Sequence, residues 1–117
     1  MKAIFLAESQ YHVSRAIQLV FEQHPDFTLI GEADHAESLL AQVCTLPPDV
    51  ILLGWQLAGA NYPRLIATIR KHCPATKIIV MSVKPELEAS IREYDVDGFI
   101  SKQIPPEEFI QALQDQI

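Results

Sequence analysis

The sequence predicts a single α/β domain built on an open, doubly wound parallel β-sheet with helices on both faces. Three observations predict this class: five short apolar runs of β type, helical stripes between them, and strict alternation of the two along the chain. Such alternation favours right-handed crossovers between parallel strands. The 117 residues are enough for one hydrophobic core and too few for two, so we expect one domain over residues 1–117.

Five segments are expected to form the strands. The third and fourth are almost continuously apolar, which is typical of parallel strands buried on both faces. In chain order the expected strands are KAIFLA (2–7), FTLIGE (27–32), DVILLG (49–54), KIIVMS (77–82) and GFIS (98–101).

The first two helices are predicted from apolar residues at helical spacing. We expect Ser9 to cap the first helix, and Asp34 with Glu37 three residues later to form a capping box at the start of the second. The apolar stripes are Val13, Ala16, Ile17, Val20 and Phe21 in the first helix, and Ala36, Leu39, Leu40 and Val43 in the second.

The remaining three helices differ in the strength of their patterns. The third is expected to start near Asn61, with Pro63 in its first turn, where a missing N–H is tolerated. The last has Pro106 near its start. The fourth, over residues 85–94, has only a narrow apolar stripe among charged residues, so we expect it to be the most exposed and the least anchored.

Composition and charge exclude several classes of function. Nine Lys and Arg against fifteen Asp and Glu give a net charge of −6, which disfavours direct binding of DNA or RNA. The N-terminus has too few apolar residues for a signal peptide or a membrane span, so we expect a cytoplasmic protein. Cys44 and Cys73 lack metal-ligand spacing and are expected to be reduced packing residues. The four histidines are scattered and expected at the surface, and no metal site is predicted.

In open parallel sheets, ligands bind outside the carboxyl ends of the strands. Here those ends are residues 7–9, 54–56, 82–83 and 101–102. The candidate functional residues are therefore few.

Four segments carry a resemblance to a known family: HPDFTLIGEA (24–33), LPPDVILL (46–53), PATKIIVMS (74–82) and DGFISKQIPPEEF (97–109). With these segments the chain resembles the receiver domains of two-component response regulators, most closely the branch that often precedes a helix-turn-helix output domain. The resemblance runs over the whole chain. It implies a flavodoxin-like three-layer sandwich with five parallel strands in the order 2-1-3-4-5 and five helices.

Part of the family's phosphorylation site has counterparts in this sequence. The resemblance assigns the hydroxyl that reads the phosphate to Ser82, the cation to Lys102 and the switch aromatic to Phe99. The acidic pair that holds Mg²⁺ falls on Glu8 and Ser9, so only one carboxylate remains.

The phosphoacceptor position falls on Gly54, which supplies neither a nucleophile nor a metal ligand. Glu8 with the backbone carbonyl of Gln56 makes a poor magnesium site, so we expect Mg²⁺ binding to be weak or absent. Asp49 lies too far along the strand to substitute. The sequence therefore predicts a degenerate receiver, or pseudo-receiver, that needs no cofactor.

Other roles remain open for the same residues. Lys102 is either a relic phosphate sensor or, as we favour, a strand-end lysine paired with Glu8, because a partly buried lysine needs a counter-charge. Ser82 is expected to bond to nearby backbone or to Lys102. Trp55 either covers the vacated pocket, protrudes as a binding anchor or, as we favour, packs at the strand end beside Gln56.

Three functions follow, in decreasing order of support. The first is a non-enzymatic signalling module that acts through a homodimer or a protein partner, with a sensor kinase or a fused DNA-binding output domain as the context that the resemblance implies. The second is a small-molecule or anion sensor that uses the vacated pocket near Lys102 and Ser82. The third is residual phosphotransfer by another nucleophile. It has the least support because the sequence has no suitably placed carboxylate to replace Gly54.

Overall fold

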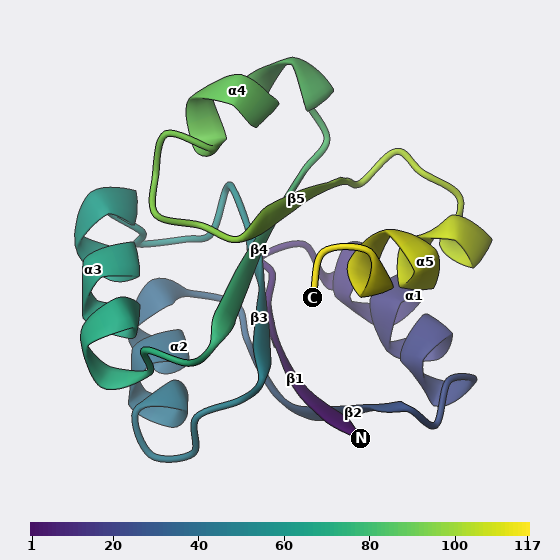
Figure 1. Cartoon of the computed structure of the whole chain (residues 1–117), viewed down its shortest axis with the longest axis horizontal. Coiled ribbons are helices and arrows are strands. Elements are labelled where there is room, and N and C mark those ends of the chain that lie inside the picture. The colour runs from purple at the N-terminus through teal and green to yellow at the C-terminus, as the bar shows by residue number, and fades with distance from the viewer.

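A five-stranded parallel sheet forms the centre of the molecule in the computed structural model, which describes all residues 1–117 (Figure 1). The order is β2-β1-β3-β4-β5, which confirms the predicted 2-1-3-4-5 topology of the flavodoxin-like fold. Three strands match their predicted bounds, and β2 and β3 differ by one residue at one end. The strands are β1 (Lys2–Ala7), β2 (Phe27–Ala33), β3 (Val50–Gly54), β4 (Lys77–Ser82) and β5 (Gly98–Ser101).

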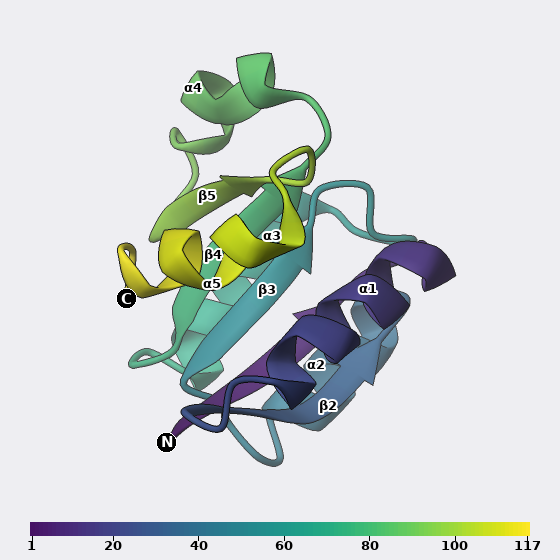
Figure 2. The same cartoon turned by 90° about the vertical axis from the view of Figure 1, so that its right-hand side faces the viewer.

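Helices cover both faces of the sheet, as the alternating pattern predicted (Figures 1 and 2). Helices α1 and α5 lie on one face, α2 and α3 on the other, and α4 lies beyond the β5 edge. No helix is both long enough and apolar enough to cross a membrane. The helices are α1 (Tyr11–Glu22), α2 (Ala36–Val43), α3 (Tyr62–His72), α4 (Glu88–Ile91) and α5 (Pro106–Gln114).

Side chains that alternate along the strands build two separate cores. On β3, Ile51 and Leu53 face the core under α2 and α3, whereas Val50 and Leu52 face the core under α1 and α5. The first core contains 17 buried residues and the second 13, so both faces of the sheet are sealed by apolar side chains. This arrangement explains why the middle strands read as continuous apolar runs.

The fourth helix is shorter than predicted. Over residues 85–94 the chain forms a 3₁₀ turn (Pro85–Leu87) and then one α-helical turn (Glu88–Ile91). Only Ile91 of this helix is buried. A narrow apolar stripe gives little packing energy, and packing is what extends short helices in proteins, so the helix ends early. The expectation of weak anchoring is consistent with this single buried residue.

The third helix starts where it was predicted, whereas the predicted cap of the second helix is wrong. Asn61 caps α3, with its side-chain oxygen accepting a hydrogen bond from Arg64 N at 3.2 Å. The capping box of Asp34 is wrong: His35 is the N-cap of α2, and the Asp34 carboxylate contacts the His35 ring at 2.7 Å. The imidazole of His35 and the backbone N–H groups of the first turn compete for the Asp34 carboxylate. Here the carboxylate contacts the adjacent, exposed imidazole and makes no bond to the helix backbone.

Two smaller expectations about side chains are wrong in part. Cys73 is buried and packs as expected, but Cys44 is exposed, and both are free thiols. Burial raises the pKa of the Cys73 thiol, which keeps it unreactive. His24 is half-buried, whereas the other three histidines are exposed.

Candidate functional site

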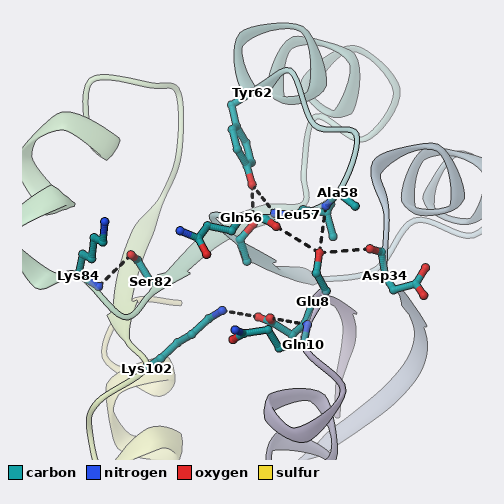
Figure 3. Close-up of polar contacts among 12 residues, drawn as sticks. Glu8, Gln10, Asp34, Gln56, Leu57, Ala58, Tyr62, Ser82, Lys84 and Lys102 are labelled. Atoms are coloured by element: carbon teal, nitrogen blue, oxygen red, sulfur yellow. Dashed lines mark hydrogen bonds and ion pairs between the residues drawn. The ribbon is translucent and has the colours of Figure 1, made fainter.

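The carboxyl ends of four strands bring the predicted site residues to one edge of the sheet (Figure 3). Glu8 follows β1, Gly54 ends β3, Ser82 ends β4 and Lys102 follows β5 by one residue. The β4 and β5 ends are locked together, because Lys102 N donates a hydrogen bond to Ser82 O at 2.8 Å. Parallel pairing of the strands thus gathers residues that are up to 94 positions apart, the separation of Glu8 and Lys102.

Glu8 and Lys102 form a buried ion pair across this edge. Lys102 Nζ lies 2.6 Å from Glu8 Oε1, and the two side chains are 10% and 2% exposed. The ammonium is the sole partner of this oxygen. The other oxygen, Oε2, accepts a hydrogen bond from Gln10 N at 3.0 Å, in the turn before α1. Both carboxylate oxygens are therefore engaged, and the pair predicted from the sequence is present.

Gly54 lies directly beneath the Glu8 carboxylate. A Cβ at position 54 would lie 2.7 Å from Glu8 Oε1 and 3.2 Å from the carbonyl oxygen of Ala7. The first separation is shorter than real Cβ contacts, so any side chain at this position has to displace the carboxylate. The glycine is explained by close approach of a neighbouring group, which is one of the physical reasons for glycine in a strand.

Tyr62, at the start of α3, holds the loop after β3. Its hydroxyl donates a hydrogen bond to Gly54 O at 2.7 Å and accepts one from Leu57 N at 2.9 Å. Burial raises the pKa of Tyr62 to about 12; the bond from Leu57 lowers it and the Glu8 charge raises it further. No local pattern in the sequence predicts these two bonds.

Trp55 packs against aromatic side chains and does not protrude. Its ring stacks on Tyr62, with centroids 4.0 Å apart and planes 16° apart, and it meets Tyr94 edge to face at 5.2 Å. Tyr94 follows α4 in the chain, so this cluster joins the ends of β3 and α4 to the start of α3. Trp55 is therefore packed at the strand end, and it also lines the small cavity there.

Ser9 ties three loops together and does not cap α1, so that prediction is wrong. Its hydroxyl oxygen lies 3.2 Å from Gln56 O and 3.3 Å from Asp34 O, and it accepts a hydrogen bond from Ala58 N at 2.9 Å. The N-cap of α1 is Gln10, which makes no side-chain capping bond. The serine hydroxyl contacts backbone groups that are 25 to 49 residues away in the chain, and the local sequence around Ser9 does not predict these contacts.

Ser82 and Phe99 are both buried. The Ser82 hydroxyl accepts a hydrogen bond from Lys84 N at 3.1 Å, which confirms the expected bond to nearby backbone. Phe99, on β5, is 7% exposed and packs into the core beneath α2 and α3. Its backbone N–H donates to the side chain of Gln116 at 2.6 Å, beyond the end of α5.

Free space at the strand ends is divided: an open hollow of about 320 Å³ lies beside the β1 and β2 ends, where Glu8, Glu32 and Asp34 make its lining acidic, whereas little space remains between the ends of β3, β4 and β5. The cavity there has a volume of about 30 Å³, and its walls include Gln10, Trp55, Gln56, Ser82 and Lys102. A cavity of this size has room for about one water molecule. Gln56 itself is exposed, and its side chain makes no hydrogen bond within the chain.

Comparison with known proteins agrees with this fold. Residues 4–114 match the family model described as the response regulator receiver domain. The nitrate/nitrite response regulator protein NarL of Escherichia coli K12 is 27% identical over 112 residues, which are 94% of this chain and 52% of that protein. The uncharacterized transcriptional regulatory protein YxjL of Bacillus subtilis is 29% identical over 95% of this chain and 52% of its own length. The chain thus spans about half the length of these curated relatives.

Solved structures show the same fold. The signal receiver domain of the putative response regulator NarL from Mycobacterium tuberculosis superimposes with a TM-score of 0.85 at 19% sequence identity, over 97% of this chain and 94% of that domain. Together, the family match over nearly the whole chain and the 2-1-3-4-5 sheet show that the chain belongs to the response regulator receiver domain family.

Proposed function

We propose that this chain is a degenerate receiver, a signalling domain that is not phosphorylated at its strand ends and that acts through protein contact. One observation carries the proposal: the Glu8 carboxylate lies over Gly54 and neutralises Lys102. The lysine that would read a phosphoryl group is already bound to an internal anion. The position on β3 where the family's aspartate would stand has no side chain.

Phosphoryl transfer needs an aligned nucleophile and a divalent cation that balances the developing charge. Glycine offers no nucleophile. Mg²⁺ needs several oxygen ligands in near-octahedral geometry, and the residues present do not fit it. Glu8 is bound by an ammonium and a backbone N–H, and the Ser9 hydroxyl is engaged with backbone groups. We therefore infer no enzymatic activity and no metal cofactor for this site.

The ion pair also explains how the fold tolerates a buried lysine without the aspartate. A buried ammonium without a counter-charge destabilises a protein strongly, so the residue is kept only if an anion meets it. Glu8 supplies that anion from the end of β1, across the ends of β3 and β4, at 2.6 Å. In this proposal the pair holds β1 and β5 in one fixed arrangement, without any input from a kinase.

Protein contact is the activity that remains for such a domain. The net charge of −6 disfavours nucleic-acid binding by these residues. The curated relatives are about twice as long, and they include proteins named as transcriptional regulators. We infer that the domain works through a homodimer or a protein partner, as the regulatory part of a protein with a DNA-binding output domain.

The strand-end cavity does not favour the alternative of an anion sensor. Its volume of about 30 Å³ is too small for an organic anion or for phosphate. Its one cation, Lys102, is already paired. A sensor at this place would have to break a buried ion pair before it could bind its ligand.

Titration of the ¹⁵N-labelled chain with Mg²⁺ and then with beryllofluoride, which mimics an acyl phosphate on aspartate, tests the proposal. We expect the amide signals of Gly54, Ser82 and Lys102 to stay in place. A receiver domain of the family that carries the aspartate serves as the positive control. Saturable shifts at the strand ends of this chain would overturn the proposal.

A second experiment tests whether the chain associates with itself and whether this association depends on a phosphoryl donor. Light scattering over a range of concentrations, with and without acetyl phosphate and Mg²⁺, measures self-association. We expect the two curves to coincide, because no phosphoryl group changes the surface. A dimerisation constant that depends on acetyl phosphate would contradict the account.

A further inference from the structure

Two cysteines stand at matching places in the fold, each as the first residue after a helix. Cys44 follows α2 and Cys73 follows α3, and both are free thiols. The two helices pack against each other on one face of the sheet, and the chain enters the next strand after each of them (Figure 1). Both thiols therefore lie at the amino ends of the strands, at the edge opposite the pair of Glu8 and Lys102.

Cys73 extends its side chain to the end of α2. It is 3% exposed, and its Sγ–H donates a hydrogen bond to the carbonyl oxygen of Val43 at 3.4 Å. Val43 directly precedes Cys44. A carbonyl oxygen lies about 2.8 Å from the next Cα across a trans peptide, so Cys73 Sγ is within about 6.2 Å of Cys44 Cα. The two Cα atoms are then at most about 9 Å apart, and a disulfide needs roughly 6.8 Å or less.

Cys44 lies on the side of α2 that faces α3. Gln42 and Thr45 line a hollow on the other side of this helix, together with Ile30 of β2. Leu40, four residues before Cys44, packs against the core that α2 and α3 share. Residues four apart lie on the same stripe of a helix, and Cys44 still has helical backbone angles. The two cysteines are thus turned toward the same gap between the helices.

We propose that Cys44 and Cys73 form a reversible disulfide bond that joins the ends of α2 and α3 when the chain meets a peroxide. Closing the bond needs a shift of about 2 Å at most between the two Cα atoms. Residues 44–47 form an exposed turn after α2, so this segment can move without disturbing the core.

The two thiols differ in access, and this difference gives each a separate role. Cys44 is exposed, so an oxidant in the solvent reaches it first. Burial raises the pKa of the Cys73 thiol, which keeps this residue unreactive toward oxidants in the solvent. Burial does not shield it from an oxidised sulfur at the end of the neighbouring helix. Cys44 is therefore the sulfur that is attacked, and Cys73 is the one that closes the bond.

The chemistry takes two steps. The Cys44 thiolate attacks one oxygen of hydrogen peroxide, so that an S–O bond forms, the O–O bond breaks and hydroxide leaves with the proton of the thiol as water. The Cys73 sulfur then attacks the Cys44 sulfenic acid, so that the S–S bond forms, the S–O bond breaks and the hydroxyl leaves with the Cys73 proton as a second water. The two sulfurs lose two electrons and the peroxide gains them.

The bond closes a loop over residues 44–73, which contains β3 and its end at Gly54. Oxidation thus fixes α2 against α3 from the amino edge of the sheet. The inference does not rest on the proposed loss of phosphorylation, because neither cysteine belongs to the strand-end site.

Peptide mapping of the full chain tests the proposal. The chain is treated with a small excess of hydrogen peroxide, its remaining thiols are alkylated without reduction, and it is digested with trypsin. Cys44 and Cys73 fall in the tryptic peptides 16–64 and 72–77. We expect the intact monomer to lose two hydrogen atoms, these two peptides to be linked, and dithiothreitol to restore both thiols.

Two variants assign the roles. Cys44→Ser changes an exposed residue, and we expect it to slow the loss of the Cys73 thiol about tenfold or more, because Cys73 then meets peroxide only through the solvent. Cys73→Ala removes the second thiol, and we expect dimedone to trap a sulfenic acid on Cys44. Should Cys73→Ala not fold, the rate measured with Cys44→Ser decides.

Three outcomes would overturn the proposal. One is a chain in which Cys44 is oxidised to sulfinic acid while Cys73 is still alkylated. Another is a disulfide between the Cys44 residues of two chains in place of the bond within one chain. The third is an equal rate of loss of the Cys73 thiol in Cys44→Ser and in the unchanged chain.

Discussion

The two halves of the strand-end edge differ in what they keep. The half formed by β4 and β5 has a buried hydroxyl and an ammonium, Ser82 and Lys102. The half formed by β1 and β3 has one carboxylate, Glu8, and a glycine. The buried cation is neutralised because the other half supplies one negative charge. The difference teaches that a single carboxylate is enough to keep this edge of the sheet electrostatically closed.

The two halves also differ in how tightly side chains are packed. Around Gly54 the carboxylate leaves no space for a Cβ. Around Ser82 the remaining cavity of about 30 Å³ gives the side chain some freedom. Substitutions on the β1 and β3 half are therefore expected to have larger effects than substitutions of Ser82.

The largest effect is expected where the two halves meet. Lys102→Met leaves the Glu8 carboxylate buried without its partner, and we expect a loss of ~3–5 kcal/mol in the free energy of unfolding. Adding Glu8→Gln removes the uncompensated charge and is expected to recover part of this loss. Urea unfolding of the single and double variants measures both values.

The matched control for the buried pair is an exposed one. Arg92 and Glu88 form an ion pair at 2.7 Å with both side chains nearly half exposed. We expect Arg92→Met to change stability by about 0.5 kcal/mol or less. Equal losses at Arg92 and Lys102 would show that burial adds nothing to the Glu8 pair.

The next effect concerns Gly54. Gly54→Ala forces a methyl group to within 2.7 Å of the Glu8 carboxylate, and overpacking of this kind destabilises by ~1–3 kcal/mol. Shortening the acid in Glu8→Asp withdraws its oxygens, so the alanine is expected to be tolerated better in the double variant. A double-mutant cycle measured by thermal unfolding gives this coupling. If the stability losses of Gly54→Ala and Glu8→Asp are strictly additive, the two residues are not coupled. That result would contradict the claim that the Glu8 carboxylate leaves no space for a side chain at position 54.

A smaller effect is expected at Tyr62, which supports the β3 end. Tyr62→Phe removes the bonds to Gly54 O and from Leu57 N, and we expect a loss of ~1–2 kcal/mol at neutral pH. Burial is the main cause that raises the pKa of Tyr62 from 10.0 to about 12. As the pH rises, this phenol therefore ionises in the unfolded chain at a lower pH than in the folded chain. Stability from this group is thus complete below pH 10 and is lost between pH 10 and 12.

Denaturant titrations of the two proteins at several alkaline pH values test this dependence. We expect the difference in stability between the unchanged chain and Tyr62→Phe to shrink as the pH rises through that window. A difference that stays constant up to pH 12 would contradict the buried, neutral hydroxyl.

The smallest effect is expected on the other half. Ser82→Ala removes one hydrogen bond to Lys84 N, beside a cavity that can admit a water molecule. We expect a loss of ~0.5–1.5 kcal/mol in thermal unfolding, at the low end of this range. A loss larger than that of Gly54→Ala would reverse the ranking of the two halves.

Much of the fold could be predicted from the sequence because its determinants are local. Strands 2–7, 77–82 and 98–101 have the predicted bounds, since each is a run of apolar residues between polar ones. The pair of Glu8 and Lys102 was also predictable, because both residues follow strands whose ends must meet at one edge.

The errors lie where distant groups compete for a side chain. Ser9 has the local sequence of a cap, but backbone groups of residues 34, 56 and 58 bind its hydroxyl. The two bonds of Tyr62 depend on how α3 packs against the β3 end, which no spacing in the sequence encodes. The contact between Glu8 and Gly54 was missed for the same reason: the sequence shows a missing side chain but not what lies above it.

The most direct test of the central claim is the intact mass of the chain after exposure to acetyl phosphate and Mg²⁺. A receiver domain of the family that carries the aspartate is treated in parallel. The account predicts that the control gains a phosphoryl group while this chain keeps its original mass. A stoichiometric phosphoryl adduct on this chain would contradict it.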